Sequence, residues 1–80
     1  MSQFSRDELL RILHGDEDFC DEILARGIVA FCDDLLAPSD VERARVVWTL
    51  VRELEVNWEG VEIIVRMREE LLATRRKLAE

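Results

Sequence analysis

Three side chains in this sequence have the right chemistry for a metal site or for nucleophilic catalysis, namely His14, Cys20 and Cys32. His14 is the only imidazole, and the two cysteines lie twelve residues apart and outside any C-x-x-C pair. The spacings of six and twelve residues match no structural zinc pattern. We therefore expect both cysteines to be reduced core residues, and we expect no metal site.

Other signatures of catalysis are missing from the sequence. There is no Gly-rich phosphate loop, and no Ser or Cys stands in a motif that would activate it as a nucleophile. Carboxylates are plentiful, but their positions suit helix caps and solvent, so no acid–base pair can be singled out. We expect a binding protein that is not an enzyme and needs no cofactor.

Negative charge is concentrated in the first half of the chain. Residues 1–40 contain three Arg against ten Asp and Glu, a net charge of −7, whereas residues 41–80 balance eight basic with eight acidic residues. An acidic surface repels phosphate and attracts basic partners. The alternative is a solvated face that only keeps a small domain soluble.

The acidic residues are densest at the start of the second expected helix. Asp18 and Glu22 share one face there at a spacing of four, and Glu17 and Asp21 form a second pair roughly 100° round the helix. The candidate partner-binding residues are therefore Asp16, Glu17, Asp18, Asp21 and Glu22.

The elements that hold these residues are predicted to be helices, in an all-α fold. The segment Ser5–Glu8 is a capping box, and it predicts a short helix over about 6–14 that stops at Gly15. A second helix should begin near Asp16 and end at Gly27 with a left-handed C-cap.

The middle of the chain allows two interpretations. Residues 28–36 read as a short strand or a buried extended connection, with a turn at Asp33-Asp34. A second capping box over Ser39–Glu42 predicts a third helix to about Leu54. Its buried positions should be Val41, Ala44, Val47, Trp48, Val51 and Leu54.

The fourth helix should begin at Trp58, because Asn57 is a good N-cap and Glu59 suits the positive end of the helix dipole. Apolar residues then recur at spacings of three and four, as in a two-stranded coiled coil of only about two heptads. We expect this stripe to form a homodimer interface, although it could instead pack within one subunit. Its members are Ile64, Met67, Leu71, Thr74 and Leu78.

The two tryptophans, Trp48 and Trp58, allow two interpretations, as partner-binding anchors or as packing at the corner between the last two helices. We expect the second.

Size and hydropathy limit the class of protein. An 80-residue chain makes one domain that hides only roughly 60% of its unfolded surface, so dimerisation would help. No apolar run is long enough for a membrane span, and Met1–Asp7 lacks the basic start and apolar core of a signal peptide. We expect a cytoplasmic protein.

This order of elements resembles the MerR-like winged helix-turn-helix superfamily and, within it, the CbpM-type chaperone modulators. The resemblance rests on Ala44–Val47, on the corner Arg52–Val61 and on the apolar run Ile63–Leu72. It covers residues 39–80 well and residues 4–37 loosely.

The resemblance implies a single domain over residues 1–80. Its parts would be a degenerate helix-turn-helix over residues 4–37, with a reduced wing or connection, and a pair of long helices over residues 39–80 that includes the dimerisation helix. Members of that family bind the J-domain of a DnaJ-like co-chaperone and restrain its stimulation of a DnaK-type chaperone, which is the function implied for this chain.

The sequence departs from DNA-binding MerR proteins, which carry basic residues on the recognition helix and Arg and Tyr in the wing. Here the second helix is acidic, Asp33-Asp34 lies where the wing would be, and Tyr is absent. Specific DNA binding is not expected. Two other functions fit the same residues: a MerR-type transcriptional regulator or its accessory subunit, and an adaptor for an unrelated basic partner.

Overall fold

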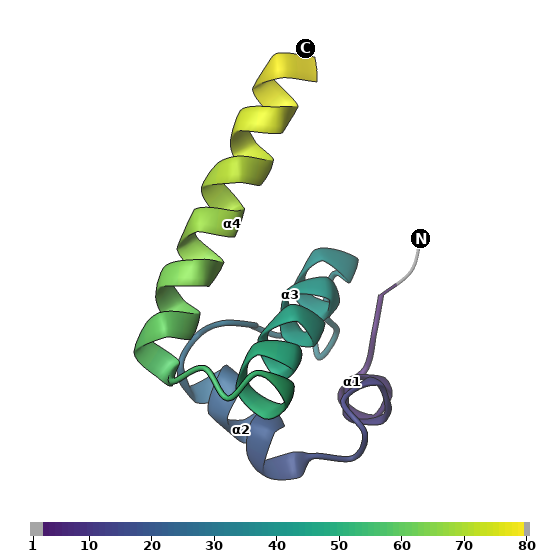
Figure 1. Ribbon diagram of the computed structural model, residues 1–80. Helices are drawn as coiled ribbons and strands as arrows, with labels where there is room; N and C mark the ends of the chain where they lie inside the picture. The colour runs from purple at the N-terminus through teal and green to yellow at the C-terminus, as the bar shows by residue number, and fades with distance from the viewer. Residues whose placement is uncertain (1–2, 80) are drawn as a thin grey trace.

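The computed structural model describes residues 3–79 and is all-α, as predicted. Its helices are α1 (Arg6–Ile12), α2 (Glu17–Ala25), α3 (Pro38–Trp48) and α4 (Trp58–Ala79), with a π-helical segment, η1 (Thr49–Glu53), between the last two. Figure 1 shows α1, α2 and α3 grouped beside the start of α4, while the C-terminal half of α4 extends away from them.

Helix α1 begins at the predicted capping box. The Ser5 hydroxyl accepts from the Glu8 N–H at 3.2 Å, and the Glu8 carboxylate accepts from the Ser5 N–H at 3.0 Å. These hydrogen bonds with Ser5 lower the pKa of Glu8. The helix ends at Ile12, and His14 (φ 62°) and Gly15 (φ 75°) form a left-handed turn into α2.

Helix α2 is capped by Asp16, whose carboxylate accepts from the Phe19 N–H at 3.1 Å. Beyond its end, Gly27 has φ 72°, which confirms the predicted left-handed residue. No strand follows among the described residues of the connection to α3. Asp33 and Asp34, with φ of 53° and 64°, form the expected turn.

Two isolated bridges order this connection in place of a strand. Cys32 pairs with Leu35, and Leu36 pairs with Phe4. The second bridge brings the segment before α1 beside the segment before α3, through hydrogen bonds of 2.9 and 2.7 Å between Phe4 and Leu36.

The prediction of a capping box at the start of α3 was wrong. Helix α3 begins one residue before Ser39, at Pro38, and its N-cap, Ala37, makes no side-chain hydrogen bond. Proline suits the first helical position, because that position needs no N–H donor and the ring fixes a helical φ. Asp40 instead accepts a hydrogen bond from Arg43 at 2.6 Å.

The end of the third helix also differs from the prediction, because five residues after Trp48 adopt π-helical hydrogen bonding. Wider turns change the direction in which later side chains point. Leu54, expected in the core, is 63% exposed, and the next residue, Glu55, has φ 54°. Val41, Ala44 and Val47 are buried as predicted.

Helix α4 begins at Trp58 as predicted. The Asn57 side chain accepts from the Gly60 N–H at 2.8 Å, and its backbone carbonyl accepts from the Val61 N–H at 2.9 Å. Val61 is fully buried, whereas no later residue of α4 that the structure describes is. None of the described helices has the length and apolar character needed to cross a membrane.

The core lies where α1, α2 and α3 meet the first turns of α4. Cys20 belongs to it, and burial raises the pKa of its thiol. Cys32 is exposed, so its assignment to the core was wrong. The bridge with Leu35 holds Cys32 in the surface turn. The largest fully buried side chains are Leu9, Leu13, Phe19, Ile23, Val29, Leu36, Val47 and Val61.

Candidate functional site

Asp16, the first of the five candidate acidic residues, is held by contacts within the chain. Arg52 of η1 donates to its carboxylate from Nε at 2.8 Å and from Nη2 at 3.3 Å. Burial alone would raise the pKa of Asp16, but the hydrogen bonds from Arg52 and from the Phe19 N–H outweigh it and lower the pKa. This carboxylate joins α2 to η1.

Two more of the five acidic residues have basic neighbours. Asp21 pairs with Arg6 of α1 at 3.2 Å, although both side chains are well exposed. Glu22 pairs with Arg26 at 2.7 Å, at a spacing of four residues. Exposed pairs of this kind contribute little stability, in most cases under about 1 kcal/mol, so a stronger partner could displace them.

Arg26 links the end of α2 to the start of α4. Besides Glu22, it reaches Glu62 at 3.3 Å, and its guanidinium lies 4.5 Å from the centre of the Trp58 ring. Trp58 also stacks on Phe19, with ring centres 6.0 Å apart. Trp58 therefore packs at the corner between helices, as expected.

Glu17 and Asp18 differ from the other three residues. Both are exposed in the first turn of α2, and neither has an ion pair with any residue that the structure describes. Their position suits the positive end of the helix dipole, which is one reason for acidic residues here. They also leave two charges free on one surface. We call Glu17, Asp18, Asp21 and Glu22 the acidic face of α2.

The apolar stripe of α4 is exposed, so the alternative that it packs within one subunit was wrong. Ile64, Met67, Leu71 and Leu78 are 36%, 63%, 53% and 84% exposed. A hollow of about 590 Å³ runs beside this stripe, over Ile64 to Thr74. The Thr74 hydroxyl donates to the Glu70 carbonyl at 3.0 Å, so it is satisfied within its own helix.

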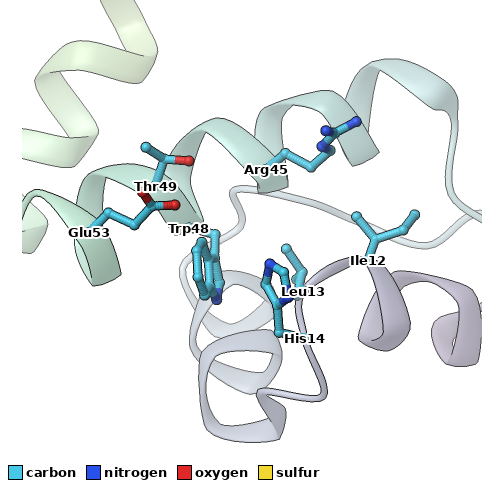
Figure 2. A pocket seen from close by; sticks show the side chains of 7 residues that line it. All are labelled: Ile12, Leu13, His14, Arg45, Trp48, Thr49 and Glu53. Atoms are coloured by element: carbon cyan, nitrogen blue, oxygen red, sulfur yellow. The ribbon is translucent and has the colours of Figure 1, made fainter.

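A pocket of about 450 Å³ opens between the end of α1 and the junction of α3 with η1. Figure 2 shows the His14 imidazole against the Trp48 indole, and the two ring centres lie 4.6 Å apart. Arg45 and Glu53 both come from the α3–η1 wall of the pocket, with the Arg45 side chain directed away from the rings, and neither has an ion pair among the described residues.

Sequence reasoning missed this pocket because its residues come from two segments that are distant along the chain. The π-helical turn of η1 forms one wall of the pocket, and such turns occur often at functional sites. The buried Trp48 Nε1 atom makes no hydrogen bond of standard geometry with a described residue, but it lies close enough to the Asp16 carboxylate to help lower the pKa of Asp16. Aromatic rings with a cation and an anion in the same lining can bind a side chain, but this lining holds no Ser or Cys nucleophile.

Arg43 was also missed, and it joins three segments. It donates to Asp40 at 2.6 Å, to the Ile28 carbonyl at 3.0 Å and to Glu69 of α4. Burial alone would lower the pKa of Arg43, but the hydrogen bonds to Glu69 and Asp40 outweigh it and raise the pKa. The spacing of Asp40 and Arg43 was the only local signal of this cluster.

Within residues 3–79, no group of three or more His, Cys, Asp or Glu side chains is arranged to hold a metal ion. Comparison of the chain with protein-family models, with curated proteins and with solved structures found no match.

Proposed function

We propose that this protein is a non-catalytic regulator that binds the J-domain of a DnaJ-like co-chaperone and restrains its stimulation of a DnaK-type chaperone. The observation that carries the proposal is the exposed, unpaired position of Glu17 and Asp18. A MerR-like helical scaffold with an acidic second helix would attract a basic protein surface and repel a phosphate backbone.

The acidic face of α2 is the proposed docking surface. Glu17 and Asp18 offer free carboxylates, while Asp21 and Glu22 can exchange weak internal pairs for pairs with a partner. Asp16 acts in support, because its contact with Arg52 fixes the start of α2. Electrostatic attraction of this kind mainly accelerates association.

We also propose a homodimer formed through the apolar stripe of α4. One chain leaves Met67 and Leu71 more than half exposed. Full burial of a side chain of this size contributes roughly 1.5–3 kcal/mol. A domain of 80 residues has a small core and gains from that burial.

The test of function is ATP hydrolysis by a DnaK-type chaperone stimulated by a J-domain co-chaperone. Added protein should return the stimulated rate toward the basal rate and leave the basal rate itself unchanged, because it occupies the J-domain and not the chaperone. Full stimulation at an excess of the protein over the J-domain would contradict the proposal.

A further inference from the structure

A second cleft lies on the side of α4 that faces α3, next to the apolar stripe, and Arg68 lines both hollows. Figure 1 shows α3 and α4 diverging from the corner that joins them, and between them is a cavity of about 580 Å³. The start of α3 and the C-terminal half of α4 line it. We call this cavity the basic cleft.

The basic cleft is positively charged, whereas the molecule as a whole is negatively charged. Three arginines of α4, Arg68, Arg75 and Arg76, line it, and none has an ion pair with a residue that the structure describes. Arg43 also lines the cleft, but its charge is already neutralised by Asp40 and Glu69. A protein of net charge −7 therefore carries a local group of free cations in a concave surface.

The cleft also has an apolar component. Leu72 and Ala79 lie among the arginines of its lining, and Leu72 is partly exposed. Arg68, Leu72 and Arg76 follow one another at spacings of four, so they form one row along α4 in which an apolar side chain stands between two cations.

We propose that the basic cleft binds an acidic, amphipathic helical segment of another protein. The complementary pattern is a carboxylate, an apolar residue and a carboxylate at the same spacing of about four residues, which places each carboxylate against an arginine and the apolar side chain on Leu72. Arginine forms paired hydrogen bonds with carboxylates. The row spans about 12 Å, or two to three turns of a bound helix.

An acidic peptide fits the cleft better than a nucleic acid does. No aromatic side chain among the described residues lines the cleft, so it lacks the stacking surface that single strands use. A longer polyanion that reached the acidic N-terminal half would be repelled there. Glu42 lines the cleft on the α3 side and has no ion pair among the described residues. Its carboxylate repels the acidic face of a bound helix, so that face turns toward the arginines of α4.

The proposal is tested with a fluorescently labelled peptide of about 15 residues, long enough to form a helix, that repeats Glu, Leu and Glu at spacings of four. The full-length protein should bind it, and binding should weaken as salt is raised. Replacing both Arg75→Glu and Arg76→Glu should weaken binding on the order of tenfold or more. Glu42→Gln should strengthen it roughly two- to five-fold, because one repulsive charge is removed.

The matched control is the pair Arg66→Glu and Lys77→Glu, which makes the same change of charge on α4 outside the cleft. It should change the affinity less than about twofold. Absence of peptide binding by the native protein, or equal losses in the two double variants, would overturn the proposal. So would binding of a single-stranded oligonucleotide, in place of the peptide, with the same dependence on Arg75 and Arg76. The cleft does not include α2, so these results are independent of J-domain binding.

Discussion

Arg52 of η1 holds the Asp16 carboxylate at the start of α2 through two hydrogen bonds, at 2.8 and 3.3 Å, across 36 residues of sequence. One carboxylate thereby caps a helix and fastens it to the π-helical segment. Two of the surfaces described above meet at this contact. The acidic face of α2 begins beside Asp16, and η1 forms a wall of the pocket at His14.

The first prediction separates the two roles of Asp16. Asp16→Ala removes the cap and the charge and should lower the free energy of unfolding by about 1–2 kcal/mol. Asp16→Asn keeps a capping oxygen and should cost less, about 0.5–1 kcal/mol. Urea unfolding in a background of Arg52→Met checks the coupling. If Asp16→Asn lowers the free energy of unfolding by the same amount in the Arg52→Met background as in the native protein, Asp16 and Arg52 do not interact.

The second prediction concerns the stability of the fold at acidic pH. The pKa of Asp16 in the folded protein lies below its ordinary value of 3.8, so its carboxylate stabilises the fold above that pH. This stabilisation is lost as the pH falls through the folded-state pKa. Urea unfolding at a series of pH values should therefore show a smaller loss of stability below about pH 4 for Asp16→Asn than for the native protein. If the free energy of unfolding depends on pH in the same way for the two proteins, the pKa of Asp16 is not lowered in the folded state.

The third prediction addresses the apolar stripe of α4. Leu71→Glu places a charge in the centre of the proposed interface and should convert a dimer to a monomer in sedimentation or light-scattering measurements. Ala73→Glu adds the same side chain to an exposed position off the stripe and should leave the dimer intact. A native protein that remains monomeric at all concentrations would end the dimer proposal.

The fourth prediction concerns DNA. The second helix carries carboxylates where a recognition helix would need basic residues, so counterion release cannot favour docking of this helix on a duplex. A gel shift with a random-sequence duplex, and with the DNA upstream of the gene for this protein, should show no retarded DNA at micromolar protein in about 0.15 M salt. Retention there would favour a transcriptional regulator over a chaperone modulator.

Local signals predicted those parts of the fold that depend on a few adjacent residues. The caps at Ser5 and Asn57 and the left-handed Gly27 are of this kind. Two local signals competed at the start of α3, and Pro38 determined the first turn in place of Ser39. The π-helical segment is not encoded in periodicity, and its shift of register explains the exposure of Leu54.

Composition predicted the acidic face of α2 but not which of its charges are free. Pairing of this face with Arg6, like the pairing of Asp16 with Arg52, depends on how helices pack, and only the spacing of Arg26 from Glu22 could be read along the chain. The pocket at His14 and the basic cleft combine segments distant in sequence, so no local pattern marks them.

The most direct test of the central claim is the rate at which the protein associates with a J-domain, measured across a range of salt concentrations. Asp18→Lys is compared with Glu59→Lys, because both positions are exposed acidic residues in the first turn of a helix. The two substitutions therefore have similar effects on charge and on the helix dipole.

If the acidic face of α2 docks the J-domain, Asp18→Lys should slow association about three- to ten-fold at low salt and flatten its salt dependence. Glu59→Lys should change the rate by less than about twofold, and the helix content of both variants should match the native protein. A J-domain that binds all three proteins with the same rate and the same salt dependence, or binds none of them, would contradict the account.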